Sequence, residues 1–550
     1  MTASIPVPLA RAVTLLATAV LCACSAGMPS VTARPITVGT QLAASQVVHR
    51  GLGAMPRTLD PSLSTDVPGQ DVIGDLFEGL TTLDAAGKIV PGVASSWEMS
   101  PDGKTWTFHL RPNARWSNGD PVTAADFVYA WRREVDPKTA AEYAGALGPI
   151  VNALAIATGK APVDSLGVKA IDPLTLRLSL TAPTPYLLSV LTDSYMQPLH
   201  RATIERYRDS WTRPGHMVSN GPFELAGLVI GDRITLVRNP YYWDAAHVRL
   251  TRVVYYPLDN DAAQLDRYLA GDLQFTDGFD ASQYHWLKSH LGSQVMTGPY
   301  FGTVMLGFNV AEPPFAHNRD LRLALSMAID RRILAEKLGQ GLPSPAYQLI
   351  PPLAGYRPSV PAWASLSAAR RHAEARRLYA AAGYSAAHPL HVELDYPTAP
   401  SERDFFGALA AMWRINLGAD VEPYNEEFRV LQQDNALHKT KLFWNAWIGD
   451  YPDPFTFLQL YQTGFQQNYG NYFNPAYDAL LAEAVRQPHV AARYRYFEQA
   501  EALLNADAPY IAISFYSTTN LVKPYLKGVE QNSAGRNLSR YMYLLEHQGN

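Results

Sequence analysis

The N-terminal segment contains all the cysteines of the chain and therefore restricts which covalent or metal cross-links can stabilise the fold. Arg11 precedes the apolar run AVTLLATAVL, residues 12–21, which is too short to cross a bilayer and is typical of an export signal. Cys22 and Cys24 follow this run, and they are the only 2 cysteines of the chain. Everything beyond residue 24 therefore folds without disulfides or thiolate metal clusters, and its stability must come from buried apolar cores.

The residues around Cys24 predict a lipid anchor. LCAC at residues 21–24, followed by Ser25, resembles the lipobox of bacterial lipoproteins, in which the last cysteine carries the lipid. On this interpretation residues 1–23 are a signal peptide and residues 24–45, rich in Ser, Ala, Thr and Pro, are a tether. The alternative is cleavage at a small-residue site, which would release a soluble protein.

Length and charge limit the classes of protein to consider. Cores stop growing near about 250–300 residues, so a chain of 550 residues is expected to form two or three domains. The 46 Lys and Arg residues against 50 Asp and Glu residues leave a formal net charge of −4. This balance lacks the basic excess that nucleic-acid binding requires.

Strand and helix patterns intermingle along the chain. TWTFHL, residues 105–110, alternates polar and apolar side chains after the turn PDG and predicts a β-hairpin. Thr123 and Asp126 have the spacing of a capping box at the start of a helix. Residues 320–338 repeat Leu and Ile at i,i+4 and predict one helical ridge, whereas YIAISFY, residues 510–516, predicts a strand. The mixture favours an α/β or α+β fold in several lobes.

Motifs for catalysis or metal binding are missing. The sequence contains no GxSxG, HExxH, GxxxxGK[ST] or GxGxxG motif. The acidic segment DNDAAQLD, residues 259–266, lacks the Gly and terminal Glu of a calcium loop. Glu426 or Glu427 with Asp450 would resemble a glycosidase pair only if the carboxyl groups lie about 5–10 Å apart, a distance that the sequence does not give. A secreted hydrolase therefore stays open as an alternative.

The segment WNAWIGDYPDPFTF, residues 444–457, favours a binding site. Asp450 lies among aromatic residues, and Pro452 and Pro454 make the segment after it a turn. A carboxylate at the end of a strand before such a turn is expected at a cleft. Catalytic acid, metal ligand and counter-charge for a cationic ligand are the three roles to weigh. The missing motifs favour the counter-charge, and Asp453 is interpreted as a turn residue between prolines.

Segments distributed along the chain resemble one known family. They are LDPSLSTDVPG, DLFEGL, PGVASSWEMSPDGKTWTFHLRPNARWSNGDPVTAADFVYAWRREVDP, LGVKAID, SNGPF, RNPYYW, NRDLRLALSMAIDR, NEEF and WIGDYPDPFTF. In this order they resemble the extracytoplasmic solute-binding proteins of peptide ABC transporters, family 5, which include oligopeptide-binding and murein-peptide-binding proteins. The resemblance covers almost the whole chain after the tether.

The resemblance implies an α/β fold of the periplasmic binding protein type, class II, with three lobes. Lobe I would comprise residues 46–77, 199–300 and 517–550, lobe II residues 78–198, and lobe III residues 301–516. The lobes would close over an extended peptide that is held by main-chain hydrogen bonds, with its side chains in hydrated pockets. Closure would present the loaded protein to a membrane permease.

The resemblance also implies ligand-binding residues. Asp450 matches an aspartate that pairs with the α-ammonium of the peptide, and Tyr143 matches a tyrosine near the same end. A buried ammonium requires such a counter-charge. The other implied positions are Val67, Ala446 and Ile448 for backbone pairing, Trp447 for a pocket wall, and Asn220 with Gly221 for the lining of the cleft.

The chain departs from the family where the far end of the ligand is expected. In oligopeptide-binding members of the family, basic residues at three positions bind the carboxylate of the ligand. In this chain the same positions are Trp444, Asn435 and Glu402, none of which is basic. Thr65 replaces a glutamate of the family's LDP segment, and Trp444 would stack on a ligand side chain instead of forming an ion pair. The candidates to replace these basic residues are Arg403, Arg429, Lys439 and Lys441, although charged side chains of this kind are more often solvated at the surface.

The expected protein is a peptide-binding subunit of an ABC importer. It would be a monomer in the periplasm or at the outer face of the cell envelope, anchored through Cys24, and would deliver oligopeptides to a membrane permease. No catalytic residue, cofactor or metal is expected. The alternatives are a binder of a cell-wall (murein) peptide or another non-standard ligand, and a signalling receptor.

Overall fold

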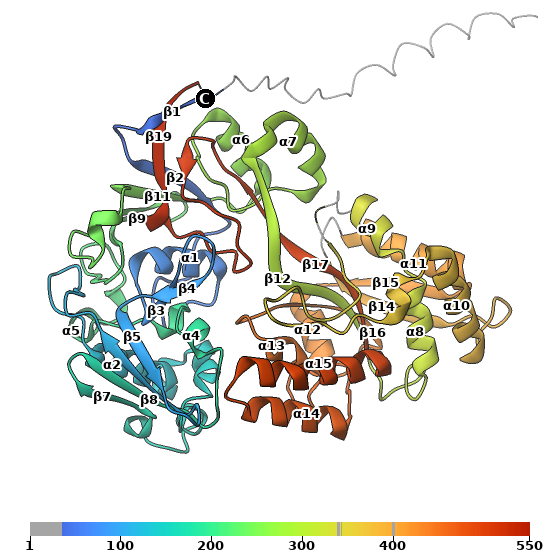
Figure 1. Ribbon diagram of the computed structural model, residues 1–550. Helices are drawn as coiled ribbons and strands as arrows, with labels where there is room; N and C mark the ends of the chain where they lie inside the picture. Colours follow the sequence, from blue (N-terminus) through green and yellow to red (C-terminus); the bar gives the residue numbers. More distant parts are fainter. Residues whose placement is uncertain (1–35, 338–341, 343, 399–401, 550) are drawn as a thin grey trace, which may run out of the picture.

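The computed structural model describes residues 36–337, 342, 344–398 and 402–549. The predicted signal peptide and Cys24 lie outside these residues. In Figure 1 the chain forms two halves, one with β1–β11 and the other with α8–α15, and two long strands pass between them. Within the described part of the chain, no helix combines the length and the apolar character needed to cross a membrane.

Four small sheets build the half that contains both ends of the described chain. The first four-stranded sheet comprises β2 (Val47–Leu52), β11 (Arg252–Pro257), β10 (Arg233–Arg238) and β9 (Phe223–Val229) in that order. The second comprises β5 (Ala94–Met99), β6 (Thr105–Leu110), β8 (Thr175–Ser179) and β7 (Val168–Asp172). The remaining strands are β3 (Thr81–Leu83) with β4 (Ile89–Pro91), and β1 (Thr37–Leu42), β19 (Tyr543–Gln548) and β18 (Leu526–Lys527).

Helices cover these sheets. Those that precede residue 208 share one continuous core with them, whereas the two that follow residue 260 pack in a separate core. The main ones are α1 (Val67–Leu76), α2 (Ala124–Val135), α5 (Arg201–Tyr207), α6 (Asp261–Ala270) and α7 (Tyr284–Leu291). The core runs from Val48 in β2 through Trp131 in α2 to Leu544 in β19. Segments from both ends of the chain are therefore packed in the same core.

A six-stranded sheet organises the other half. Its strands, in order, are β13 (Ser344–Pro345), β17 (Tyr510–Leu521), β12 (Val295–Phe308), β16 (Leu442–Ile448), β14 (His391–Pro397) and β15 (Asp420–Glu426). The helices are α8 (Arg319–Met327), α9 (Arg331–Lys337), α10 (Ala368–Ala381), α11 (Glu402–Leu417), α12 (Phe428–Ala436), α13 (Phe455–Leu458), α14 (Pro475–Arg486) and α15 (Val490–Asp507).

The two faces of this sheet pack against different helices. Leu306 and Ile511 belong to a core with α8, α10 and α11, whereas the neighbouring Met305 and Ala512 belong to a core with α13, α14 and α15. This alternation follows from the period of two in a strand. Both faces are covered, so a ligand can approach the sheet only along an edge.

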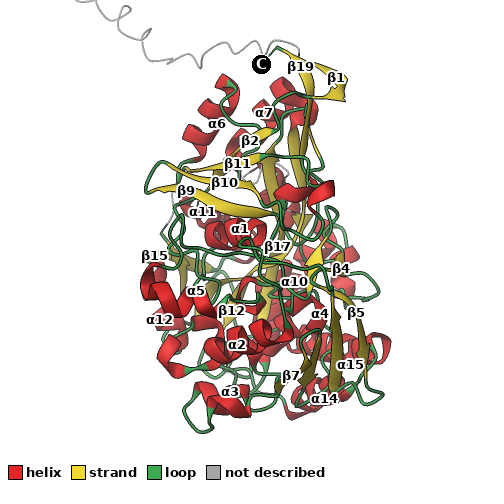
Figure 2. Ribbon diagram, turned by 90° about the vertical axis from the view of Figure 1, so that its left-hand side faces the viewer, coloured by secondary structure: helices red, strands yellow, loops and turns green. Residues whose placement is uncertain are grey.

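The long strands β12 and β17 connect the halves. They pair antiparallel from Val295 with Leu521 to Gly307 with Tyr510, and the register is irregular between Pro299 and Thr303. Figures 1 and 2 show both strands running from the region of α6 and α7 into the six-stranded sheet. They end in different cores, so a change in angle between the halves must be absorbed by this strand pair.

Most predicted elements are confirmed, and one is wrong. The β5–β6 hairpin and the capping box of Thr123 and Asp126 are present. The predicted ridge over residues 320–338 is instead two helices, because α8 ends at Met327 and α9 begins at Arg331. The Arg331 guanidinium donates to the carbonyl oxygens of Ser326 at 2.9 Å and Ala512 at 2.6 Å, which turns the chain inward between the helices.

A buried ion pair joins α2 to the segment that precedes α1. Arg133 forms two hydrogen bonds with the Asp60 carboxylate, at 2.9 and 2.7 Å, and the Trp211 indole donates to the same carboxylate at 3.2 Å. Glu134 is fully buried beside this pair. Burial raises the pKa of Glu134 to about 8, and Ser62 and Arg133 oppose this only in part.

Glu134→Gln should make the protein less sensitive to rising pH. The unfolded chain ionises Glu134 near pH 4.5 while the folded chain keeps the proton up to about pH 8, so wild-type stability falls across this interval. Glutamine has no proton to lose, and we expect it to be more stable at pH 8 by roughly 1–3 kcal/mol. Urea unfolding at pH 5 and pH 8 tests this, with the exposed Glu205→Gln as control. An equal effect of Glu134→Gln at both pH values would contradict it.

Candidate functional site

Asp450 lies directly after β16, at the end of a strand held close to β12. The Gly449 N–H donates to the carbonyl oxygen of Phe301 at 2.8 Å. A Cβ at Gly449 would lie 2.5 Å from the Phe301 ring and 3.1 Å from the Phe457 ring, so only glycine fits between them. The strand therefore ends with Asp450 turned out of the sheet.

Thr456 orients the Asp450 carboxylate. Its hydroxyl donates to Asp450 Oδ2 at 3.1 Å, and it accepts hydrogen bonds from the Asp450 N–H at 3.2 Å and the Trp447 indole at 3.0 Å. Thr456 is fully buried, so its position is fixed by packing. The pattern WIGDYPDPFT therefore builds a short turn in which one hydroxyl holds both the strand end and the acid.

Asp453 anchors the same turn and has more than a turn role. Its carboxylate accepts two hydrogen bonds from Arg493 of α15, at 2.9 and 3.1 Å, and both side chains are almost completely buried. Next to it, Tyr451 stacks on Tyr186 of the opposite half, with ring centroids 4.0 Å apart and planes within 5°. The Asp453–Arg493 ion pair thus fixes the turn that carries Asp450 to α15, and Tyr451 of the same turn contacts the other half.

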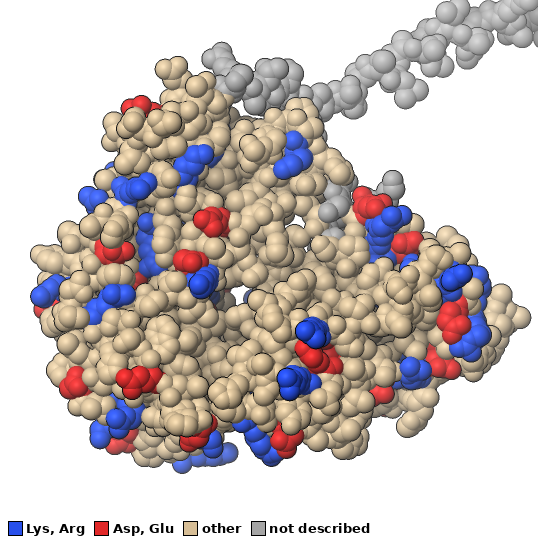
Figure 3. Space-filling view, viewed as in Figure 1, with Lys and Arg blue, Asp and Glu red and all other residues tan. Residues whose placement is uncertain are grey.

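The charge of Asp450 is uncompensated. Among the described residues no Lys, Arg or His side chain forms an ion pair with it. Its surface is open to solvent, yet surrounding protein limits its hydration. Loss of hydration is the main cause that raises the pKa of Asp450 to about 6, with Asp193 adding to the rise and Thr456 opposing it. Figure 3 shows a hollow between the two halves. A poorly hydrated acid without an ionic partner is suited to receive a cation.

Tyr143 and Asp450 lie close enough to interact across the halves. Tyr143 is half-buried and stacks on Tyr195, with ring centroids 5.1 Å apart. Burial raises the pKa of Tyr143 most, and the Asp450 carboxylate raises it further. Two residues that are 307 positions apart in the sequence (450 − 143) therefore face the same space.

One edge of β16 has free backbone groups. The contacts of Gly449 with Phe301 and of Asn309 with Lys441 show that odd-numbered residues direct their N–H and C=O groups toward β12. Even-numbered residues direct theirs to the opposite edge, where β14 pairs only with Leu442 and Phe443. The ladder with β14 ends at the N–H group of Trp444, and the backbone groups of residues 446 and 448 have no partner strand among the described residues, so an extended chain can pair there.

The predicted aromatic residues lie on opposite faces of β16. Trp447 packs toward the core of α13–α15 and donates to Thr456, whereas Trp444 packs toward the core of α8, α10 and α11. Trp444 meets Phe428 of α12 edge-on, with ring centroids 6.3 Å apart. Ile448 is 44% exposed on the same side of the strand as Trp444. A chain at the free edge would therefore pass beside both rings.

Thr65 and Val67 lie at the start of α1. Val67 is the first residue of this helix and is 57% exposed. Arg57 donates to Thr65 Oγ1 at 3.3 Å and lies 3.7 Å from Glu142, the neighbour of Tyr143. This surface network places the Thr65 segment near Tyr143.

Asn220 is engaged inside the protein. Its amide oxygen accepts from the Glu78 N–H at 3.1 Å, its amide nitrogen donates to the Glu78 carbonyl at 2.8 Å, and it is 2% exposed. Gly221 packs on the backbone of Leu76, where a Cβ would approach within 2.6 Å. The side chain of Asn220 therefore supports the end of α1, and the place of this loop in the lining of the cleft stays a prediction.

The far-end positions carry no cation. Asn435 is fully buried, and its amide oxygen accepts from the Thr440 hydroxyl at 2.7 Å. Glu402 begins α11, and burial raises its pKa. It lies near Tyr516 of β17: burial raises the pKa of Tyr516 to about 12, and Glu402 adds to the rise. Lys439 pairs with Asp434 at 2.7 Å. These environments do not resemble a carboxylate-binding site.

Sequence patterns missed the residues that support the site. Arg493, Tyr195 and Asp193 come from distant segments and match no motif. Only the T in DPFTF, six residues after Asp450, could have been singled out as a local hydroxyl. Among the described residues, no group of three or more His, Cys, Asp or Glu side chains is arranged to hold a metal ion.

Comparison with known proteins identifies the family. The model of the bacterial extracellular solute-binding proteins, family 5 (middle), matches residues 88–469. The chain belongs to this family. Over 520 residues it is 39% identical to the periplasmic murein peptide-binding protein MppA of Escherichia coli (strain K12), which covers 94% of this chain and 96% of that protein.

Two further comparisons agree with this assignment. The chain is 35% identical over 538 residues to the periplasmic oligopeptide-binding protein OppA of Escherichia coli (strain K12), covering 97% of this chain and 98% of that protein. The unliganded open form of the murein tripeptide binding protein MppA superposes with a TM-score of 0.83 at 38% identity, covering 92% and 99% of the two chains. The predicted family and the periplasmic binding protein-like fold are confirmed. The relatives are solute-binding proteins of the periplasm.

Substitution of the two aspartates of the turn should have different effects on the free energy of unfolding. Asp453→Asn leaves Arg493 buried without its counter-charge, and we expect a loss of about 3–5 kcal/mol. Asp450→Asn removes a poorly hydrated, unpaired carboxylate, so stability at pH 7.5 should be equal or slightly higher. Denaturant unfolding measures both. A loss of similar size in the two variants would show that Asp450 is also held by an internal partner.

Proposed function

We propose that this protein is the peptide-binding subunit of an ABC importer and that it holds the ligand as an added strand on β16. The observation that carries the proposal is the free edge of β16, which ends at the uncompensated Asp450 carboxylate. Backbone pairing binds peptides without regard to sequence, and a carboxylate at one end fixes their direction. This combination suits a receptor for diverse short peptides.

The ammonium of the ligand would pair with Asp450. An acid whose pKa is raised by poor hydration gains most when a cation replaces the missing water. Tyr143 would contribute an aromatic face beside the ammonium. Ala446 and Ile448 would pair with the ligand backbone, Trp444 and Trp447 would contact side chains on either face, and Val67 and Thr65 would approach from α1.

The protein would act at the outer face of a membrane. The periplasmic relatives support this location and delivery to a permease, and the predicted lipobox supports a lipid anchor on Cys24. The predicted tether of residues 24–45 extends too far, because Thr37–Leu42 form β1 and pair with β19, so we propose a tether that ends before Thr37. We further propose the three lobes given above, with lobes I and II in one half and lobe III in the other. The strand pair β12–β17 would be the hinge along which a monomer closes.

A second candidate ligand is a cell-wall peptide. The relative with 39% identity is a murein peptide-binding protein, and this chain lacks a cation at Trp444, Asn435 and Glu402. A ligand whose far end is not a simple carboxylate would suit these neutral and acidic positions. Peptide binding at Asp450 is common to both candidates, and they differ at the far end.

Native mass spectrometry of the protein purified from a peptide-rich lysate would distinguish the ligands. A mixture of short peptides supports the oligopeptide receptor, and a single defined species with the mass of a cell-wall peptide supports the second candidate. Protein without any bound peptide, together with no heat on titration of tri-, tetra- and penta-alanine, would refute peptide binding.

Asp450→Ala should weaken peptide binding strongly. Removal of one partner of a poorly hydrated charge pair costs about 2–5 kcal/mol, so the affinity should fall by a factor of 30 or more. Calorimetry with the alanine peptides measures this. N-acetylation of the peptide should weaken binding to wild type by a similar factor and have little further effect on the variant. Equal affinity of variant and wild type would remove Asp450 from the site.

Cys24→Ala tests the proposed anchor. Without the lipid-bearing thiol, the protein should move from the membrane fraction to the soluble fraction of the cell envelope. Cys22→Ala is the matched control and should leave the distribution unchanged. Retention of the Cys24→Ala protein in the membrane fraction would refute the anchor.

A further inference from the structure

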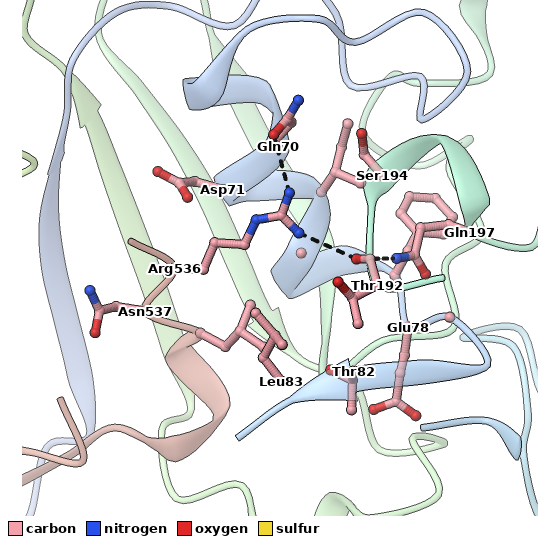
Figure 4. A pocket seen from close by; sticks show the side chains of 15 residues that line it. Gln70, Asp71, Glu78, Thr82, Leu83, Thr192, Ser194, Gln197, Arg536 and Asn537 are labelled. Atoms are coloured by element: carbon pink, nitrogen blue, oxygen red, sulfur yellow. Dashed lines mark hydrogen bonds between the residues drawn. The ribbon is translucent and has the colours of Figure 1, made fainter. Parts of the chain in front are cut away.

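Arg536 connects three segments behind the wall that faces Asp450. It lies between β18 and β19, and its guanidinium donates to Asp193 at 2.8 Å, Gln70 of α1 at 3.3 Å and the Thr192 carbonyl at 3.4 Å. Figure 4 shows the guanidinium between the helix that carries Gln70 and the segment of Thr192 and Ser194. The C-terminal segment and α1 thereby hold residues 192–194 in place.

Asp193 connects Arg536 to two stacked tyrosines, Tyr195 and Tyr143. One carboxylate oxygen accepts from Arg536, and the other accepts from the Tyr195 hydroxyl at 2.9 Å. Tyr195 is buried, and its ring stacks on Tyr143 with planes 26° apart. The position of Tyr143 opposite Asp450 therefore depends on Arg536, which acts on the Tyr143 ring through Asp193 and Tyr195.

Asp193 also contributes negative charge to the site. The groups that face Asp450 from the other half are Tyr143, Tyr195 and Asp193, and those from its own turn are Tyr451 and Thr456. Of these, Asp193 raises the pKa of Asp450. Arg536, which pairs with Asp193, opposes the effect of Asp193 on the pKa of Tyr143 and of Tyr195. A cation beside Asp450 would therefore lie in the field of two carboxylates, and Arg536 compensates the second of them in part.

A polar cavity borders the ion pair. Gln70, Ser194, Gln197 and Arg536 are among the residues that line it. The Ser194 hydroxyl and the Gln197 amide oxygen are buried there without a hydrogen-bond partner from the protein. Such a cavity is suited to ordered water, which favours the ionised form of the Asp193–Arg536 pair although burial raises the pKa of Asp193.

We propose that Asp193 is a positioning residue of the ammonium subsite. Held by Arg536, it fixes the Tyr195–Tyr143 wall opposite Asp450 and adds a second negative charge to the field that binds the cation of the ligand. The inference rests on the proposed peptide binding and assigns a role to a residue pair outside the predicted site.

The test is the pH profile of affinity for tri-, tetra- and penta-alanine with free N-termini, measured by calorimetry from pH 4.5 to 8. Wild-type affinity should rise with pH through a midpoint near about 6, because protonated Asp450 cannot pair with the ammonium. The double variant Asp193→Asn with Arg536→Gln removes both charges of this pair, and Arg50 remains to compensate the nearby buried Asp71. Its midpoint should fall by roughly half a unit or more, and its affinity at pH 7.5 should fall by about 3- to 10-fold.

Tyr195→Phe distinguishes the effect of Asp193 on the position of the Tyr195–Tyr143 wall from the effect of its charge on the pH midpoint. It removes the hydroxyl that Asp193 holds but keeps the ring and both charges, so the affinity should fall while the midpoint stays at the wild-type value. Glu205→Gln breaks the exposed Arg201–Glu205 pair of α5, 2.6 Å long, and is the control expected to change neither quantity.

The outcomes separate this inference from the proposed function. If wild type binds none of the three peptides, peptide binding itself fails. If wild type binds with a pH midpoint and the double variant keeps that midpoint, Asp193 does not contribute charge to the site. If Tyr195→Phe binds with wild-type affinity, Asp193 does not position the wall. The expected pair of results, a lower midpoint in the double variant and weaker binding at an unchanged midpoint in Tyr195→Phe, supports both parts.

Discussion

The free edge of β16 is the constraint on which the site depends. Both faces of the six-stranded sheet are covered by helices, and β14 diverges from β16 after Phe443, so the backbone groups of residues 446 and 448 have no partner strand in the described part of the chain and can pair with solvent or a ligand. Unpaired strand edges invite another chain. Asp450 at the end of this edge and Tyr143 across from it restrict which chain can bind and in which direction.

The turn after β16 shows how one short segment serves stability and binding with the same residue type. Asp453 is buried with Arg493, and its charge is fully compensated. Asp450 lies three residues earlier, is open to solvent and has no ionic partner among the described residues, and burial of its surroundings raises its pKa. The paired carboxylate holds the turn rigid so that the unpaired one is presented in a fixed position.

The sequence predicted the fold class, the family and many elements because these depend on local patterns. The hairpin at β5–β6 follows from alternation, and the start of α2 follows from the capping box. The ridge over residues 320–338 was a wrong prediction, because the buried contacts of Arg331 interrupt a pattern that is locally helical. Asn220 was expected at the cleft, and its contact with Glu78 became apparent only from the packing of two distant segments.

The supporting residues of the site lay beyond sequence reasoning for a physical reason. Arg536, Asp193 and Tyr195 act through hydrogen bonds between segments separated by 343 residues (536 − 193), and no spacing rule links them. The role of Asp453 was likewise underestimated, because its partner Arg493 lies 40 residues away on α15. Charged residues that pair across a fold have no signature in the sequence until the fold brings them together.

The most direct test of the central claim is a crystal structure of the protein with tri-alanine bound. The account predicts that the ammonium of the peptide lies within hydrogen-bond distance of the Asp450 carboxylate and that its main chain pairs with the N–H and C=O groups of Ala446 or Ile448. A peptide bound elsewhere, or one in the cleft whose ammonium does not contact Asp450, would contradict the account.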